Sequence, residues 1–237
     1  STTSGTAQAN NYRHSLAAQN SDVRHNAFTS GTFNPWMSFT LEEARDGPTA
    51  NQNSIRSFKG CVVNEYTINV NQGDPINVEV AFMAQTGSFT SGGITAVTAG
   101  SNRPYLWSDA DWTVDGTSQG TVKSLSFKLS NNFDAPHYIN GSRTPGVPFP
   151  VNRDYSVEVT QDMQSTTIGS LWNQYWLGGS AFNAVLDINN VQNIGSHHLI
   201  LTLSGCKITN MSEPGTLDGV SEITYTVTAG SVNALAH

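Results

Sequence analysis

Residues 60–83 read GCVVNEYTINVNQGDPINVEVAFM, and this stretch decides the fold class. Apolar side chains stand at every second position on both sides of the turn-forming residues 72–74; they are Tyr66, Ile68, Val70, Ile76, Val78, Val80 and Phe82. This period-two alternation across a Gly-containing turn predicts a β-hairpin. Each strand runs for about ten residues, longer than the ~5–6 that are usual. The alternation indicates an antiparallel sheet with one packed face and one wet face.

The same alternation recurs along much of the remaining chain. It predicts strands at residues 36–41, 105–107, 112–114, 124–129, 155–159, 182–188, 197–208 and 222–228. One segment, 165–177, instead has apolar residues at helical spacing, and Gly178-Gly179 would end it. The helix is expected to pack on a sheet through Leu171, Trp172, Tyr175 and Trp176. These elements predict a mainly β protein, an antiparallel β-sandwich with one flanking α-helix.

The chain is expected to divide into an arm and one domain. Residues 1–34 are rich in Ser, Thr, Ala, Asn and Gln and lack a core of their own, which predicts an N-terminal arm. Residues 35–237 are expected to form a single β-sandwich domain. Polar or Gly- and Pro-rich stretches predict long loops at 42–57, 87–104 and 133–150 within it.

The composition excludes several classes of protein. Charged residues make up 12% of the 237, against an ordinary ~25%, which excludes a coiled coil. The longest apolar runs are far shorter than the ~20 residues that cross a bilayer, so no membrane partner is expected. The net charge of −7, from 18 acidic and 11 basic residues, opposes the wrapping of nucleic acid.

Two cysteines and the first residues bear on the compartment. Cys61 and Cys206 could pair only across most of the chain and belong to no Cys-x-x-Cys motif, which favours buried free thiols over a disulfide. Each follows a glycine, Gly60 or Gly205, and a glycine inside a strand often marks a bulge. The opening residues show no secretory signal, so synthesis in the cytoplasm is expected.

No motif for catalysis or metal binding appears. The sequence contains neither a Gly-x-Ser-x-Gly elbow nor a phosphate-binding loop, and its histidines lack zinc-ligand spacing. Asp109, Asp111 and Asp115 superficially resemble a calcium loop but lack its glycine and its closing glutamate. We therefore expect no enzyme activity, no metal and no cofactor.

The order of elements after residue 58 carries a likeness to a known family. Gly60-Cys61-Val62-Val63-Asn64 leads into the long hairpin, and a strand at 122–129 ends in Asn131-Asn132. There follow a loop with Gly141 and Pro148, Arg153-Asp154-Tyr155-Ser156-Val157-Glu158-Val159-Thr160, the single helix, and three closing strands ending near Thr228-Ala229. This order resembles the tail tube (major tail) proteins of tailed bacterial and archaeal viruses. The N-terminal arm and the insertion at 87–112 fall outside the resemblance.

The resemblance implies a structural virion protein of the viral tail. Such proteins form hexameric rings in which long hairpins join into a β-barrel around a channel, and the rings stack into a tube. The implied partners are further copies of the chain, other tail proteins (terminator, tape measure, baseplate or tip) and double-stranded viral DNA that passes without specific binding. The arm and residues 42–57 would make the contacts between rings or subunits.

For the channel wall, the resemblance singles out the polar face of the long hairpin and one further strand. The candidate residues facing the channel are Glu65, Thr67, Asn69, Asn71, Asn77, Glu79 and Glu158. No Lys or Arg occurs between Cys61 and Asn102, and each basic contact with a phosphate would slow moving DNA. Long strands and a long arm are costly to order in a monomer but become buried in an oligomer. An ordinary solvated sheet face is the alternative interpretation of this set.

Two other classes of protein fit the same pattern. A carbohydrate-binding β-sandwich would stack sugars on Tyr105, Trp107 or Trp112. A capsid-decorating or shell protein would also be β-rich and self-assembling. Microscopy of the concentrated protein distinguishes a tube protein from a sugar-binding module. A tube protein should form rings or tubes with a central hole, whereas a sugar-binding module should stay monomeric.

Overall fold

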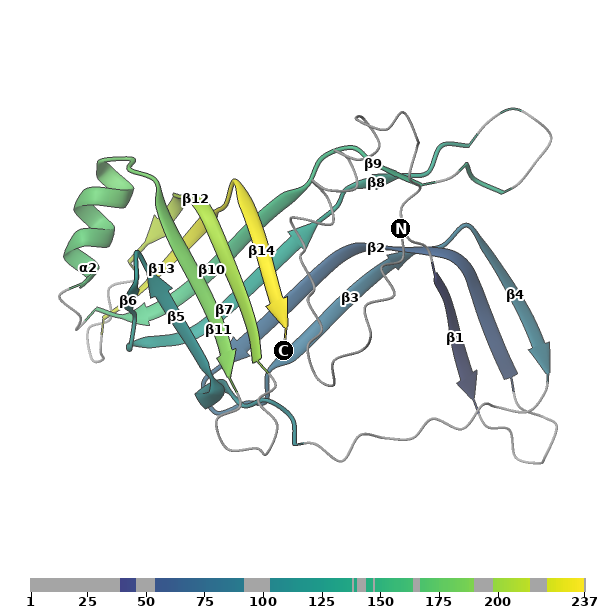
Figure 1. The fold of residues 1–237 in the computed structure, drawn as a ribbon, viewed down its shortest axis with the longest axis horizontal. Coiled ribbons are helices and arrows are strands. Elements are labelled where there is room, and N and C mark those ends of the chain that lie inside the picture. The colour runs from purple at the N-terminus through teal and green to yellow at the C-terminus, as the bar shows by residue number, and fades with distance from the viewer. Residues whose placement is uncertain are drawn as a thin grey trace, which may run out of the picture.

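The computed structural model of the chain describes residues 39–45, 54–91, 103–137, 139, 144–146, 148–163, 167–189, 198–213 and 221–236 (Figure 1). The arm expected at 1–34 lies outside these residues. The strands are β1 (Phe39–Arg45), β2 (Ser54–Asn71), β3 (Asn77–Met83), β4 (Thr86–Ser91), β5 (Ala110–Val114), β6 (Thr117–Ser118), β7 (Val122–Ser130), β8 (Phe133–Asp134), β9 (Phe149–Pro150), β10 (Asp154–Asp162), β11 (Phe182–Asn189), β12 (His198–Ser212), β13 (Glu222–Thr228) and β14 (Ser231–Ala236).

The strands form two layers that share β12. The first layer, here called the long sheet, has the order β3-β2-β7-β10-β13-β12. The second layer, here called the short sheet, has the order β14-β12-β11-β5-β6. Every pairing is antiparallel, and the short sheet lies across the long sheet (Figure 1). The predicted antiparallel sandwich and its long hairpin are therefore confirmed.

One hydrophobic core fills the space between the two sheets. Phe127 of β7, Tyr225 of β13 and Leu203 of β12 have no exposed surface and belong to the same buried cluster. The alternate residues of each strand turn inward, as the period-two pattern requires. The Trp112 indole donates a hydrogen bond to the Tyr225 hydroxyl, 3.2 Å away, which joins the two layers inside the core.

Two long strands change sheets at a glycine. β12 pairs with β11 and β14 up to the bend at Gly205–Cys206 and with β13 from Lys207 onward. β2 pairs with β1 and β4 up to the bend at Gly60–Cys61 and with β3 and β7 from Val62 onward. Both glycines are left-handed, with φ of +64° and +66°, and the strand register shifts beside each. The bulges expected at these glycines are confirmed.

Each bend is followed by a buried cysteine. Cys61 and Cys206 have no exposed surface and are both free thiols, as expected. The Cys61 thiol donates to the Phe58 carbonyl at 3.3 Å. Burial raises the pKa of the Cys206 thiol to about 11, so this group stays protonated at neutral pH.

A three-stranded extension projects from the sandwich (Figure 1). It consists of β1, residues 54–59 of β2, and β4, and is here called the ribbon. Phe89 on β4 is 66% exposed, and every residue of β4 is exposed. The ribbon therefore has no apolar core of its own.

The loop predictions at 42–57 and 87–104 were partly wrong. Residues 42–45 and 54–57 pair with each other across the ribbon, with Glu42 opposite Ser57 and Glu43 opposite Arg56. Residues 87–91 belong to β4. The strand signal was absent because both faces of the ribbon meet solvent, which removes the alternation of apolar and polar side chains. Residues 46–53 and 92–102 lie outside the described part.

Three other differences are local. The segment expected as a strand at 105–107 instead leads into a 3₁₀ turn, η1 (Trp107–Asp109), which the Asp109 carboxylate holds by accepting the Leu106 N–H at 2.8 Å. Within the loop expected at 133–150, β8 pairs with β9. The closing strand β14 was not predicted.

The single helical segment is present where it was expected. It comprises α2 (Thr167–Ser170) and the π-helical η2 (Leu171–Leu177), and Gly179 at φ +62° ends it. Residues 165–166, the first two of the predicted helix, lie outside the described part. The helix lies at the end of the sandwich that is opposite the ribbon (Figure 1).

Candidate functional site

The seven polar residues singled out for the channel wall lie on one face of the long sheet. They are Glu65, Thr67, Asn69 and Asn71 of β2, Asn77 and Glu79 of β3, and Glu158 of β10. Their strand neighbours Ile68, Val157 and Val159 point into the core, so these residues point to the opposite side. We call this surface the polar face.

Strand register brings the polar face together across all six strands. One row runs from β3 to β12 through Asn77, Asn69, Ser126, Glu158, Thr226 and Asn210. The sequence pattern placed residues on a face within each strand. Which residues share a row depends on the pairing of strands that are far apart in the chain, and the sequence pattern does not contain this pairing.

Short uncharged side chains on the polar face satisfy one another. The Ser126 hydroxyl donates to the Asn69 side-chain oxygen at 2.7 Å, and the Asn77 amide donates to the Glu79 carboxylate at 3.2 Å. The hydroxyls of Thr160 and Thr224 are 3.0 Å apart. These hydrogen bonds hold the side chains close to the sheet.

The polar face also contains three lysines, which the sequence pattern did not predict there. Lys128 lies opposite Thr67, and its ammonium is 3.2 Å from the Glu65 carboxylate. Lys123 is 2.6 Å from both Asp162 and Glu222. Hydrogen bonds to Asp162, the larger cause, and to Glu222 raise the pKa of Lys123. The third lysine, Lys207, makes no salt bridge with the described residues.

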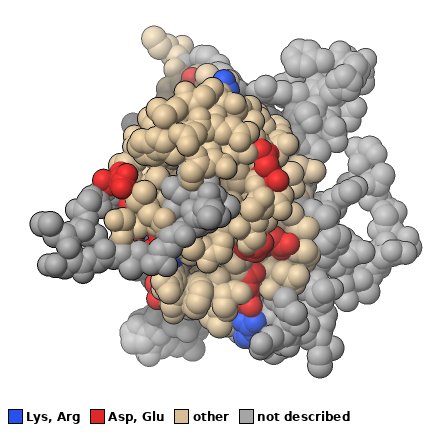
Figure 2. Space-filling view, turned by 90° about the vertical axis from the view of Figure 1, so that its left-hand side faces the viewer, with Lys and Arg blue, Asp and Glu red and all other residues tan. Residues whose placement is uncertain are grey.

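Carboxylates outnumber these lysines on the polar face. They are Glu65, Glu79, Asp154, Glu158, Asp162 and Glu222. Figure 2, which views the molecule from the helix side, likewise shows scattered carboxylates and little Lys or Arg on the described surface. Two of the three lysines are neutralised by neighbouring acids, so a phosphate near this face would meet mainly negative and neutral groups.

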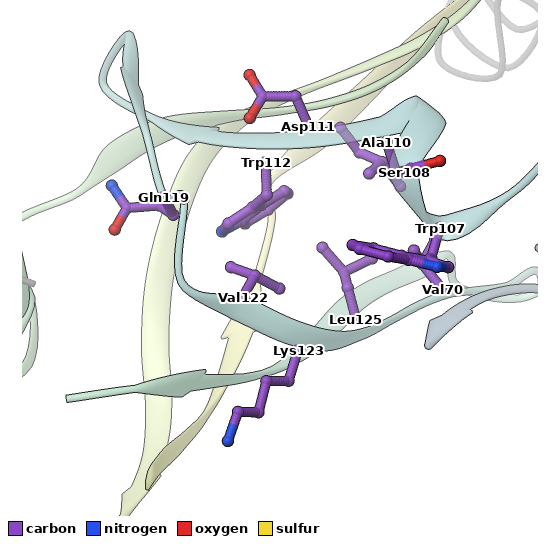
Figure 3. A pocket seen from close by; sticks show the side chains of 12 residues that line it. Val70, Trp107, Ser108, Ala110, Asp111, Trp112, Gln119, Val122, Lys123 and Leu125 are labelled. Carbon is purple, nitrogen blue, oxygen red and sulfur yellow. The ribbon is translucent and has the colours of Figure 1, made fainter. Parts of the chain in front are cut away.

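Of the aromatic residues considered for sugar stacking, Trp107 is 41% exposed, whereas Trp112 belongs to the core. Trp112 is 4% exposed, and its ring lies inside the sandwich. A pocket of about 250 Å³ lies beside it, with Val122 and Leu125 between Trp112 and Trp107, while Asp111 and Lys123 point away (Figure 3). Both apolar and polar residues line the pocket, but Asp111 and Lys123, which could bind the hydroxyl groups of a sugar, do not point into it.

The three aspartates that resemble a calcium loop have separate partners. Asp109 is held by Arg103 at 2.8 Å, a hydrogen bond that lowers the pKa of Asp109. Asp111 accepts from Ser118, and Asp115 accepts from Tyr175. Among the described residues no group of three or more His, Cys, Asp or Glu side chains could hold a metal ion. Nor does this part of the chain contain a helix long and apolar enough to cross a membrane.

The helix residues differ in how they meet the sandwich. Leu171 and Tyr175 are buried, whereas Trp172 and Trp176 are half-buried, and Trp176 packs against the core. The Tyr175 ring lies 4.8 Å from that of Phe182. Its hydroxyl donates to Asp115 at 2.7 Å, and this hydrogen bond, with burial, raises the pKa of Tyr175 to about 12.

The described residues thus form a two-layer β-sandwich with one helix, a projecting ribbon, an acidic polar face and two sheet edges that have no further strand among these residues. A family profile described as "Phage tail tube protein" matches residues 2–229. The chain therefore belongs to the phage tail tube protein family, and it is a structural, tube-forming component of the virion tail.

Several solved structures share part of the fold at low sequence identity. The SPP1 tail tube protein is 12% identical, with a TM-score of 0.44 over 56% of this chain and 80% of its own. The anti-feeding prophage tube-terminating cap is 14% identical, with a TM-score of 0.43 over 62% of this chain and 100% of its own. A chain of the native gene transfer agent virion is 12% identical, with a TM-score of 0.38 over 54% and 95%. A search of curated proteins found no match.

Proposed function

We propose that copies of this chain form hexameric rings that stack into a tube, and that the polar face lines the channel through which double-stranded DNA is ejected. The observation that carries this proposal is the pairing of lysines on the polar face: Lys128 with Glu65, and Lys123 with Asp162 and Glu222. A wall that does not grip phosphates lets a polyanion slide, because each free Lys or Arg contact adds affinity for DNA. The chain has no catalytic role in this proposal.

Each channel-facing residue has a role in keeping that wall inert. Thr67, Asn69, Asn71 and Asn77 supply neutral groups that reach only a short distance into the channel. Glu65 neutralises Lys128, while Glu79 and Glu158 add negative charge. The wall is thereby polar enough to stay wetted and too acidic to bind DNA.

Other parts of the chain would contact neighbouring rings or subunits and the other tail proteins. The ribbon, which includes residues 42–45 and 54–57, and the N-terminal arm at 1–34 would contact neighbouring rings or subunits. The tube ends would meet the terminator, tape measure and baseplate or tip proteins. In this proposal the chain is made in the host cytoplasm and then built into the tail.

Microscopy of the purified chain at high concentration tests the assembly. Rings or tubes with a central hole are expected, and monomers at every concentration would overturn the proposal. A second experiment tests the channel wall with the variant Asn69→Lys plus Glu158→Lys, which adds positive charge at the centre of the polar face.

The control for that variant places the same change in charge on the outward side of the short sheet, as Asn183→Lys plus Asp111→Lys. Short duplex DNA is added to preformed tubes, followed by DNase. The polar-face variant should retain duplex that is protected from DNase, whereas the control should hold only DNA that the enzyme digests. Equal protection in both, or in neither, would remove the polar face from the channel.

A further inference from the structure

The long sheet ends in two strands that lack a partner on their outer side. At one edge, β3 pairs only with β2 among the described residues. At the other edge, residues 207–212 of β12 pair only with β13 within the same part of the chain. Unpaired backbone N–H and C=O groups along such edges can template the addition of another strand.

The directions of these two edges suit a joint between copies. The six strands of the long sheet alternate in direction, so β3 and β12 run opposite to each other. If β12 of one copy lay beside β3 of the next, the new pairing would be antiparallel, like every pairing inside the sheet. The sheet would then continue with its polar face on the same side in each copy.

The charges at the two edges are complementary. Glu79 is the only charged residue of β3, and Lys207 is the only charged residue between 207 and 212. Both are exposed, and both lie on the polar face in the same cross-strand row, which runs Glu79, Thr67, Lys128, Ser156, Thr228 and Lys207. Lys207 is the one lysine of this face without a carboxylate partner in the described part.

The other side of β3 exposes apolar surface at the same edge. Val78 is 46% exposed and Phe82 is 42% exposed, although both are on the side that faces the core elsewhere in the sheet. A strand added beside β3 would cover them. An edge that combines free backbone groups, exposed apolar side chains and a single charge is typical of an interface rather than of a solvated surface.

We propose that β3 of one copy pairs with residues 207–212 of β12 in a second copy, with Glu79 and Lys207 forming a salt bridge across the joint. This head-to-tail contact uses two different surfaces, so its repetition closes a ring when the rotation from one copy to the next divides a full turn. The inference rests on the proposed tube function and names the strands that would join the ring.

A charge exchange tests the salt bridge. Glu79→Lys and Lys207→Glu each place like charges at the joint and should raise the protein concentration needed for assembly by roughly ten-fold or more. The double variant restores opposite charges and should return that concentration to within a few-fold of wild type. The pairing would be overturned if the single variants assembled at the same protein concentration as wild type. It would also be overturned if the effects of the two changes on that concentration simply added in the double variant.

Cross-linking tests the joint without depending on tubes. A chain carrying both Glu79→Cys and Lys207→Cys should give a ladder of disulfide-linked multimers on mild oxidation, and either single variant should give dimers at most. The control, Glu79→Cys plus Asn183→Cys, should give no ladder beyond dimers. Tubes without the ladder would refute this joint and leave the tube function standing; a ladder without tubes would do the reverse.

Discussion

The bends at Gly60–Cys61 and Gly205–Cys206 use the same local geometry and lead to different outcomes. At each, a long strand leaves one sheet through a left-handed glycine and enters another beside a fully buried cysteine. At Gly205, the parts of β12 on both sides of the bend contribute to the same core, through Leu203 before the bend and Ile208 after it. At Gly60 only the later part of β2 does so, and the earlier part becomes the exposed ribbon.

The difference teaches that a bend does not determine what the strand will pack against. At Gly205 the short sheet and the helix cover the strand, and the bend forms a corner of the sandwich. At Gly60 the ribbon carries exposed Leu41 and Phe89 with no described element over them. The sandwich buries its apolar residues within the described part of the chain, whereas the ribbon carries apolar surface that no described element covers.

The largest expected difference between the two regions is in the cost of removing a phenylalanine. Phe127→Ala, in the sandwich core with no exposed surface, should lower the free energy of unfolding by about 3–5 kcal/mol. Phe89→Ala, on the ribbon and 66% exposed, should change it by less than about 0.5 kcal/mol. Urea unfolding of the dilute protein measures both. A large loss at Phe89 would mean that the ribbon has an intramolecular core after all.

Replacing either bend glycine by alanine should lower the free energy of unfolding, and the two losses should differ in size. An alanine in the left-handed region costs about 1–2 kcal/mol, which Gly205→Ala should show in the free energy of unfolding. Gly60→Ala should cost more, because its new Cβ would lie 2.7 Å from the Gln85 side-chain oxygen, which must then shift.

The control for the bend variants is Gly120→Ala, at a glycine with open space around it and no left-handed φ. Its effect should stay within about 0.5 kcal/mol by urea unfolding. If Gly205→Ala were as mild as this control, the strain assigned to the sandwich bend would be refuted.

The helix braces the Gly205 bend, and alkaline pH should weaken that brace. Tyr175 packs on Phe182, which lies opposite Cys206, and donates to Asp115. Because the pKa of Tyr175 rises from 10.0 to about 12 on folding, its stabilising effect is complete below pH 10 and is lost between pH 10 and 12. Tyr175→Phe should lower stability by about 1.5–3 kcal/mol at neutral pH, since the lost hydrogen bond has a charged acceptor.

The pH profile separates this effect from simple loss of packing. The difference in unfolding free energy between wild type and Tyr175→Phe should shrink from pH 10 to pH 12, as followed by circular dichroism in urea. A constant difference over that range would show that the hydroxyl contributes nothing through its proton.

The smallest expected effects concern ion pairs. Lys123→Met in the sandwich removes contacts with both Asp162 and Glu222 and should cause a slight, salt-sensitive fall in melting temperature. Arg56→Met on the ribbon removes one exposed contact with Glu43 at 3.7 Å and should cause no measurable change. A larger fall in melting temperature for Arg56→Met than for Lys123→Met would contradict the proposed difference between ribbon and sandwich.

The sequence already determined the elements that depend on local pattern. The alternation at Tyr66, Ile68 and Val70 identified the long hairpin, and the spacing of Leu171 and Tyr175 identified the helix. The same alternation placed Asn69 and Glu158 on polar strand faces. Side chains alternate across a strand whatever the strand pairs with, so these properties could be read without knowing any partner.

Only the tertiary structure decided which strands meet. Lys128 reached Glu65 because β7 pairs with β2, and no local pattern contains that register. Apart from residues 39–41 of β1, the strands of the ribbon were not predicted, because solvent on both faces removes the apolar signal. Trp112 proved to be a core residue rather than a surface residue. Strand pairing is a contact between residues distant in the chain, chosen by the combined packing of all the strands, and a single stretch of sequence does not contain it.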